Sequence, residues 1–397
     1  MIFTKQINSL HELDIKYKPY KPSIKGNYDA CVAFYKTFIA PFQQDEDGEI
    51  YKKLTESWHQ IIDMYNSPER TYHNLHHLSE LFFLINELSN LLPENPDPAD
   101  VQLLDDLGIV AVFHDAVYDV RKGNNEELST ELFKVFVDNF VKLPIEDTEL
   151  RTRLINIADA IMETKTHIAT TVISSMFCAI DMYVITHYPF SELMKYEHRV
   201  FKEYQMFDYS KYLPARINLL CELNERYNNP DIEKLIDYVS TRKIRIGVYA
   251  GSFNPFHIGH LNIFHQAQSM FDKVIIARGV NPEKDNIKEL KTNFSIVLPF
   301  VQYEEFTGYI YEYVHSKNSD NIEVTLVKGL RNADDFKEEL KQHRYNRFLQ
   351  KSAKHKKQLN AVYLFSDAEF EHISSRDIRM MEKIKEGSAL DLMVIRK

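Results

Sequence analysis

Ten consecutive residues, GSFNPFHIGH from Gly251 to His260, combine a flexible turn with two imidazoles. The apolar run before them ends at Gly251, where the missing side chain lets the backbone turn sharply and a ligand come close. A helical pattern begins near Gly259, so its free N–H groups and positive dipole end face the same crevice. His257 and His260 lie about one helical turn apart and can donate hydrogen bonds to phosphate while neutral. The segment predicts a phosphate-binding strand, turn and helix; the alternative is such a turn with two incidental histidines.

A second group of ligand-type residues lies in the first half of the chain. His114 and Asp115 stand in an apolar stretch that we expect to be one helix, and Asp181 stands in another. A buried carboxylate costs several kcal/mol unless it is paired, and one divalent cation would satisfy all three residues. His73 and His77 are spaced to share a helix face and to add nitrogen ligands. The pattern indicates a metal site; the alternative is a polar core network of histidines bonded to carboxylates.

The elements that must position these residues differ between the two halves. Up to about Tyr238 apolar residues recur at three and four positions, which predicts helices that include 75–88, 101–117, 131–141, 154–162 and 172–185. Beyond Lys243 we expect strands at 244–250, 274–277, 324–327 and 362–365, with helices at 259–271, 303–316 and from 334 onwards. This alternation predicts a parallel sheet with helices on both faces. We therefore predict a multidomain chain, with an all-α domain over 1–240 and an α/β domain over 241–397.

Composition excludes several classes of protein. The 397 residues carry a formal net charge of -10, so the surface repels polyanions on average, and the basic segment 341–358 is interpreted as a solvated helix face. The cysteines Cys31, Cys178 and Cys221 are far apart, which is typical of reduced intracellular thiols. No window approaches the roughly 18 apolar residues of a membrane span. We expect a cytoplasmic protein that binds neither nucleic acid nor membrane. The sequence is compatible with a homo-oligomer but does not determine the oligomeric state.

The segment 251–260 resembles the HxGH signature of the nucleotidyltransferase superfamily, whose fold is Rossmann-like. More narrowly, ordered motifs from about Ile244 to Ile384 resemble those of phosphopantetheine adenylyltransferase: Val327-Lys-Gly-Leu-Arg331, Asp335-Phe336, Glu339, Asn346-Arg347 and Ile373-Ser-Ser375. This resemblance implies transfer of AMP from ATP, with Mg²⁺, to 4′-phosphopantetheine, giving dephospho-coenzyme A and pyrophosphate. No general base is needed, because a phosphomonoester with a second pKa of about 6 is already an anion at pH 7.

The same resemblance implies roles for individual residues. Ser252 and His260 would contact the ATP phosphates, Lys284 would clamp the reacting phosphates, and Arg331 would hold them. The implied catalytic residues are His257, His260, Lys284 and Arg331. The implied nucleotide- or substrate-binding residues are Gly251, Ser252, Phe253, Lys328, Glu339, Ser374, Ser375 and Arg379.

The chain departs from the family pattern in several places, among them position 328 and the stretch 285–295, which is shorter than usual. Lys328 stands where the family usually has arginine, and lysine keeps the charge but lacks the bidentate fork. Adenylyl or cytidylyl transfer to another phosphorylated acceptor, such as nicotinamide mononucleotide or glycerol phosphate, is therefore the alternative.

The first half, from about Tyr51 to Tyr204, resembles the HD superfamily of metal-dependent phosphohydrolases. The resemblance rests on the ordered motifs YHNxxH, FHD, NEExS, TxxH and Asp, with Lys202-Glu-Tyr204 as a late motif. It implies an HD-type helical domain that hydrolyses an unidentified phosphoester with a divalent transition metal such as Mn²⁺, Fe²⁺ or Zn²⁺. The implied metal ligands are His73, His114, Asp115 and Asp181. The residues implied to support them, to bind a second metal or to transfer protons are His77, Glu126, Glu127 and His167. The alternative is a non-catalytic module that senses a nucleotide.

Overall fold

The computed structural model describes residues 48–140, 148–280, 292–352, 359–385, 387–388 and 390–393. Within this part the chain forms two compact units. The first unit comprises the described residues up to Glu203 together with Leu220–Leu235, and the second comprises Tyr204–Leu219 together with those from Ile236 onwards. Helices α10 (Tyr209–Tyr227) and α11 (Pro230–Thr241) contribute residues to both units.

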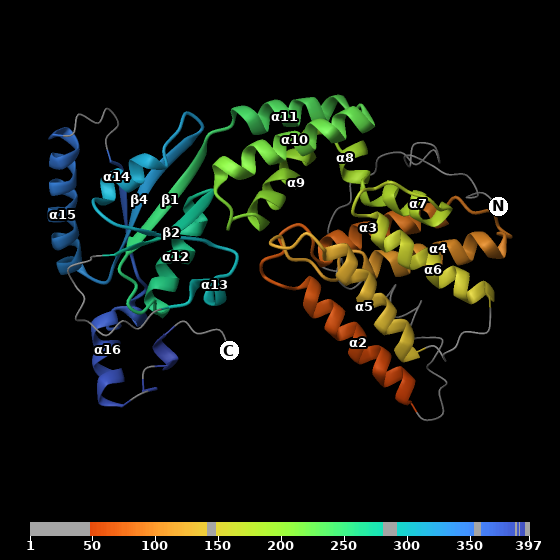
Figure 1. Ribbon diagram of the computed structural model, residues 1–397, viewed down its shortest axis with the longest axis horizontal. Coiled ribbons are helices and arrows are strands. Elements are labelled where there is room, and N and C mark those ends of the chain that lie inside the picture. Colours follow the sequence, from red (N-terminus) through yellow and green to blue (C-terminus); the bar gives the residue numbers. More distant parts are fainter. Residues whose placement is uncertain are drawn as a thin grey trace. The chain divides into compact units, whose positions relative to one another are not determined.

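The first unit is helical throughout its described part (Figure 1). Its elements are α2 (Glu49–Tyr65), α3 (Leu75–Ser89), α4 (Pro98–Phe113), α5 (Asn125–Phe140), α6 (Thr148–Glu163), α7 (Val172–Asp181), α8 (Tyr183–His187) and α9 (Phe190–Glu203). The single helix predicted over 172–185 is in fact two, because the chain leaves helical geometry at Met182. In the described residues of the whole chain, no helix has the length and apolar character needed to span a membrane.

Helix ends determine where the ligand-type residues of the first unit lie. Helix α4 is buried on almost every side over its second half and packs against α3, α6 and α7. Helix α4 ends at Phe113, so His114 and Asp115 lie in the turn that follows it. The prediction that both residues stand inside the helix was wrong. At the start of α3 the side chain of Asn74 accepts a hydrogen bond from His76 N, which fixes the first turn of that helix.

The second unit contains one five-stranded parallel sheet. Its strands are β1 (Ile244–Gly251), β2 (Lys273–Gly279), β3 (Gln302–Phe306), β4 (Ile322–Leu330) and β5 (Ala361–Phe365). The helices between them are α12 (Ile258–Met270), α13 (Phe294–Val297), α14 (Ile310–Ser316) and α15 (Ala333–Ser352), followed by α16 (Ser375–Ile384). The prediction of one helix over 303–316 was wrong for its first part, which belongs to strand β3, whereas its last part is helix α14.

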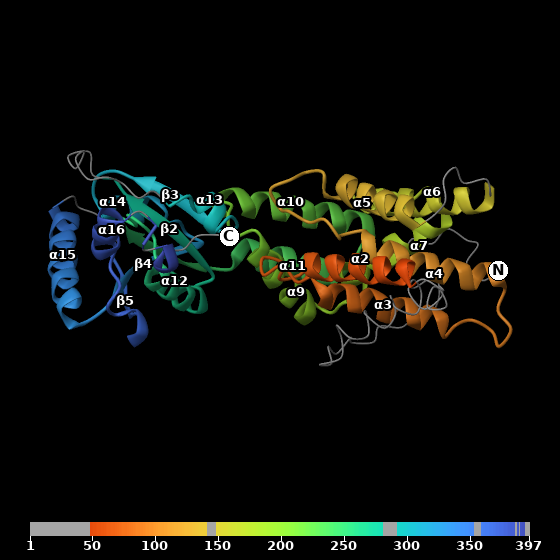
Figure 2. The ribbon, with the colours of Figure 1, turned by 90° about the horizontal axis from the view of Figure 1, so that it is seen from below.

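In the strand order β3-β2-β1-β4-β5 the chain places β2 and β3 on one side of β1, and then crosses to the other side with β4 and β5. The order is therefore reversed between β1 and β4. Right-handed crossovers place α12, which follows β1, and α14, which precedes β4, on opposite faces of the sheet (Figure 2). The crossovers diverge at this point, and a crevice opens there at the carboxyl ends of the two strands. This is the Rossmann-like arrangement expected for a nucleotidyltransferase, and it brings Gly251 of β1 close to Gly329 of β4.

Replacing Ile276, which is fully buried in the central part of β2, tests the packing of this sheet. Ile276→Ala should lower the free energy of unfolding by about 2–5 kcal/mol, because a cavity remains where the side chain packed. Urea denaturation of the full chain measures the loss. The control is Ile296→Ala in α13, where the side chain is 53% exposed and little should change. Equal effects of the two changes would contradict the assignment of β2 to the core.

Candidate active sites

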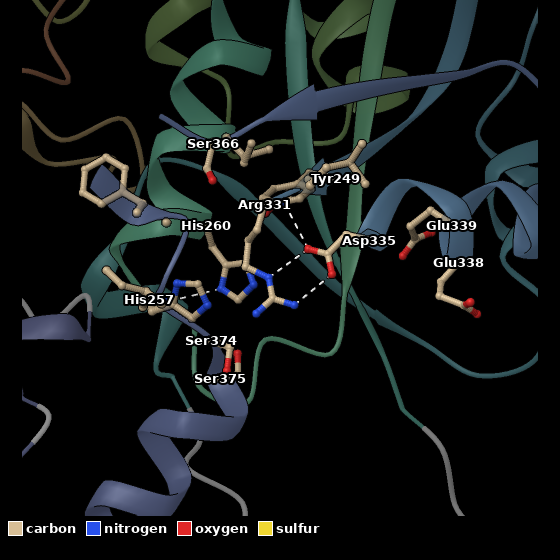
Figure 3. Close-up of a pocket in the computed structure, with 16 residues that line it drawn as sticks. Tyr249, His257, His260, Arg331, Asp335, Glu338, Glu339, Ser366, Ser374 and Ser375 are labelled. Atoms are coloured by element: carbon tan, nitrogen blue, oxygen red, sulfur yellow. Dashed lines mark hydrogen bonds and ion pairs between the residues drawn. The ribbon is translucent and has the colours of Figure 1, made fainter. Parts of the chain in front are cut away.

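A cavity of about 310 Å³ lies at the carboxyl ends of β1 and β4 (Figure 3). The turn after β1 leads into α12, whose first turn supplies the cavity with helix N–H groups and two histidines. Strand β4, helix α15 and the start of α16 complete the wall. Six of the residues predicted for the transferase site line the cavity: His257, His260, Arg331, Glu339, Ser374 and Ser375.

The two histidines form one unit. Their rings stack with centroids 3.7 Å apart, and His257 N donates to Nδ1 of His260 over 3.3 Å. Because Nδ1 accepts, the proton of a neutral His260 is on Nε2, which makes Nε2 a hydrogen-bond donor. Burial, reinforced by nearby Arg331, lowers the pKa of His257 to about 4, and burial followed by His257 lowers the pKa of His260 well below its usual value. Both rings are therefore neutral at pH 7.

Arg331 is the main cation that faces this cavity. Its Nε and Nη2 donate to the two carboxylate oxygens of Asp335 over 2.8 and 2.9 Å, one helical turn further along. Figure 3 shows the guanidinium held between His260 and Asp335. Nη1 makes no hydrogen bond within the described residues, so this donor is available to a ligand. Sequence analysis gave Asp335 no role in the site, although its place four residues after Arg331 signals such a pair.

Lys328 does not line the cavity. Its Nζ lies 3.2 Å from Oε2 of Glu339, so the two predicted substrate-binding residues pair with each other. Sequence analysis also missed Tyr249 and Ser366, which do line it. Among the described residues, Oγ of Ser366 and Nδ1 of His257 are buried atoms without a hydrogen-bonding partner. Such atoms are costly unless a bound ligand or water supplies the partner.

Four other predicted residues shape the turn and do not line the cavity. A Cβ atom on Gly251 would lie 2.8 Å from the ring of Phe253, so a side chain there would displace that ring. The Phe253 ring is buried and packs edge-on against His260. The carbonyl of Ser252 accepts a 3.3 Å hydrogen bond from Arg278, and Arg379 donates to the carbonyl of Asn254. Of the lining residues, Ser375 also donates to the carbonyl of Pro255 over 2.9 Å. Lys284 lies outside the described residues.

A second group of polar residues gathers in the first unit, where α3, the turn after α4, and the end of α7 converge. One side-chain atom from each of His77, His114 and Asp181 lies within 4.8 Å of the others. Nε2 of His77 is 3.4 Å and Nε2 of His114 is 3.7 Å from Oδ1 of Asp181. Asp115 approaches from the same side, with Oδ2 3.2 Å from Nε2 of His114 and 4.0 Å from Nε2 of His77.

The donor set fits a divalent cation. In the described part of the chain, Nε2 of both histidines is buried without a hydrogen bond, although carboxylates lie nearby. His114 Nδ1 lies 3.0 Å from the carbonyl of Ala111, and donation there would turn the lone pair of Nε2 towards the carboxylates. Burial lowers the pKa of His114, but Asp115 and Asp181 outweigh it and raise that pKa to about 9. Two imidazoles and two carboxylates are a ligand set suited to Mn²⁺, Fe²⁺ or Zn²⁺.

The remaining residues predicted for this site have other partners. His73, predicted as a ligand, is not among the three residues whose atoms gather in the cluster, and its Nδ1 lies 2.7 Å from Oε2 of Glu203. His77, predicted only as a supporting residue, does belong to the cluster. His167 supports the cluster from outside, with Nε2 2.8 Å from Oδ2 of Asp181. Glu127 pairs with Lys165, and Glu126 makes no contact with the cluster in the described residues.

Comparison with known proteins defines the class of the second unit. The family model Cytidylyltransferase-like matches residues 248–381, the part that carries the sheet and its cavity. This part of the chain is thus similar to nucleotidyltransferases, which supports nucleotidyl transfer.

Three relatives narrow the class further, and each is a phosphopantetheine adenylyltransferase. The one from Lawsonia intracellularis is 30% identical over 36% of this chain and 80% of its own length. The one from Picosynechococcus is 30% identical over 38% of this chain and 80% of the relative. The one from Clostridium novyi is 28% identical over 35% of this chain and 83% of the relative. Through its C-terminal part, the chain belongs to the phosphopantetheine adenylyltransferase family.

The neutral state of His257 makes a pH-dependent contribution to stability. Its pKa falls from 6.5 to about 4 on folding, so below pH 6.5 the unfolded chain binds a proton that the folded chain does not. Stability should fall as the pH drops from 6.5 towards 4, by about 3 kcal/mol from this residue. His257→Gln should remove that part of the acid sensitivity, measured by urea denaturation at pH 7 and 4.5. His265→Gln, at an exposed position of the same helix, is the control; equal acid sensitivity in both variants contradicts the prediction.

Proposed function

We propose that the chain is a bifunctional enzyme. Its second unit transfers AMP from ATP to 4′-phosphopantetheine, giving dephospho-coenzyme A and pyrophosphate. Its first unit is an HD-type domain that hydrolyses a phosphoester with a divalent metal. The first proposal rests on the cavity that gathers two neutral histidines and Arg331 at a helix N-terminus, within a part of the chain 28–30% identical to phosphopantetheine adenylyltransferases. The second rests on the cluster of His77, His114 and Asp181.

The residues of the cavity suit phosphoryl chemistry without a general base. An oxygen of the acceptor phosphate attacks the α-phosphorus of ATP, and the bond from that phosphorus to the bridging oxygen breaks to release pyrophosphate. Nε2 of His260 and the N–H groups of α12 donate hydrogen bonds to the oxygens on which charge develops. Nη1 of Arg331 holds the phosphates, and Lys284 would add a second cation. Mg²⁺ bound with ATP would neutralise the charge of the leaving pyrophosphate.

Removing the His260 donor should disable this reaction. His260→Ala should lower pyrophosphate release from ATP and phosphopantetheine by about 10²–10³-fold, the usual effect of deleting a donor to a developing charge. His265→Ala, on the exposed side of the same helix, is the matched control. Near-normal release by the His260 variant would overturn the assignment of the cavity. Running the assay with ATP or CTP against nicotinamide mononucleotide and glycerol phosphate tests the alternative acceptors.

In the first unit the cluster would hold a cation through His77, His114, Asp181 and the adjacent Asp115. Such a cation would polarise a phosphoryl oxygen and lower the pKa of a water molecule. His167 holds Asp181 through a 2.8 Å contact, and Arg70 donates to the carbonyl of Asp115 over 2.7 Å. The first contact orients the carboxylate of Asp181 before a metal binds, as outer partners do in metal sites, and the second holds the backbone of Asp115.

The metal proposal is tested by metal content and by hydrolysis together. His77→Gln and Asp181→Asn should each reduce bound Mn²⁺, Fe²⁺ or Zn²⁺ in the purified full chain to near zero and abolish release of inorganic phosphate from p-nitrophenyl phosphate. His59→Gln, an exposed position on α2, should keep both. Metal retained in the His77 variant would contradict the ligand set. Metal bound by the unaltered chain without hydrolysis of any ester would instead favour the nucleotide-sensing module.

A further inference from the structure

The segment 114–119, called the ligand loop below, follows helix α4 and begins with His114 and Asp115 of the proposed metal cluster. The loop forms neither a helix nor a strand, so it lacks the ladder of backbone hydrogen bonds that fixes a regular element. Residues that are carried by a loop are positioned only as well as the loop itself. The geometry of the cluster therefore depends on the side chains that hold this backbone.

Arg70 holds the first part of the ligand loop. Its Nη1 donates to the carbonyl of Asp115 over 2.7 Å, and its Nη2 donates to the carbonyl of Ala116 over 2.8 Å. The guanidinium also lies over the rings of Tyr65 and Tyr118, with Cζ 5.2 and 5.6 Å from the two centroids. Because the guanidinium fork is rigid and the residue is buried, it fixes two neighbouring carbonyls in one orientation.

Asn125 and Ser129, two residues of the NEExS motif at the start of α5, hold the second part of the loop. Oδ1 of Asn125 accepts from the N–H group of Asp119 over 3.0 Å, and Nδ2 donates to the carbonyl of the same residue over 3.2 Å. Oγ of Ser129 accepts from the N–H group of Val117 over 3.1 Å and donates to its carbonyl over 3.3 Å. Both side chains are buried. They satisfy the loop backbone much as a neighbouring strand would.

The two glutamates of the same motif have different surroundings. Glu127 pairs with Lys165, and Glu126 makes no contact with the cluster. In the part of the chain that the structure describes, neither carboxylate bonds the ligand loop. The contacts of this motif with the loop are therefore made by its asparagine and its serine.

We infer that three buried side chains, those of Arg70, Asn125 and Ser129, are positioning residues for the metal cluster. They hold the ligand loop so that His114 and Asp115 face the cation site before a cation binds. This inference rests on the metal site proposed for the first unit. A loop that became ordered only around the cation would lose conformational entropy at that moment, and the binding affinity would fall accordingly. Partners outside the ligand set that order the loop during folding remove this cost.

Removing one partner at a time tests the inference through metal affinity. In the metal-free full chain, Asn125→Ala and Ser129→Ala should each raise the dissociation constant for Mn²⁺ by about 10–100-fold, the usual effect of such outer partners. Arg70→Lys, which keeps the charge but loses the fork, should raise it in the same direction. Saturation should still reach the same number of Mn²⁺ ions per chain, because no ligand is removed. Free Mn²⁺ is counted by electron paramagnetic resonance, and Glu131→Gln, an exposed change on α5, is the matched control.

A second control separates positioning from a general loss of stability. Leu88→Ala, at a fully buried position near the other end of α3, should destabilise the unit through a cavity but keep the affinity for Mn²⁺. Amide hydrogen exchange in the metal-free chain gives a readout that needs no cation. Ser129→Ala should speed exchange at the amide of Val117, and Asn125→Ala should speed exchange at the amide of Asp119. Leu88→Ala should change neither amide selectively.

Each other outcome overturns the inference. If the unaltered chain binds Mn²⁺ and the variants of Asn125, Ser129 and Arg70 bind it equally well, the positioning role is wrong and the metal site stands. An equal loss of affinity in Leu88→Ala would show that the effect is one of general stability. A lower number of ions per chain at saturation would make the altered residue part of the ligand set. If the unaltered chain binds neither Mn²⁺ nor Zn²⁺, the metal proposal fails as well, which separates the two failures.

Discussion

A polar or charged group that leaves water must find a partner inside the protein, and this requirement determines how both sites are built. In the first unit imidazoles satisfy buried carboxylates: His167 for Asp181, and His73 for Glu203. Nε2 of His77 and of His114 is buried there without a hydrogen bond in the described residues, which is what a cation would satisfy. In the second unit the buried groups are the imidazoles themselves. Burial, with Arg331 as a neighbouring cation, lowers the pKa values of His257 and His260, so the rings stay neutral. The same residue type thus has opposite electrostatic roles in the two units.

The topology of the sheet explains why the transferase residues come from such distant parts of the chain. All strands are parallel, so every carboxyl end lies at one edge, and the reversal between β1 and β4 leaves that edge open. The turn at Gly251 and the run Gly329–Arg331 are there because their strands are adjacent, with Val248 paired to Leu326. Arg379 and Ser375 of α16 then bind the carbonyls of the β1–α12 turn. The cavity therefore depends on backbone contacts made by residues that the sequence resemblance assigns to the nucleotide.

Much of this arrangement could be predicted from local patterns. The apolar run before Gly251 and the helical spacing after it are strong signals, because a buried strand and a helix N-terminus each have a distinct periodicity. The segment Gln302–Phe306 has no strand signal of its own, since QYEEF is too polar to look like a strand, and only pairing with β2 makes it one. The relation between Arg331 and Asp335 was visible in their spacing. The partners of Ser366 or Ser375 were not, because they come from the tertiary fold.

The different places of His73 and His77 show the same limit more sharply. A spacing of four residues puts two side chains on one face only if both belong to one helix. Helix α3 begins at Leu75, after the cap formed by Asn74, so His73 precedes the helix and its side chain takes another direction. Asn74 is a good capping residue and could have revealed this boundary. What no local pattern could reveal is Glu203, whose carboxylate holds the backbone and the ring of His73 together. Because that contact depends on the packing of α9 against the start of α3, the role of the YHN motif is decided by tertiary structure.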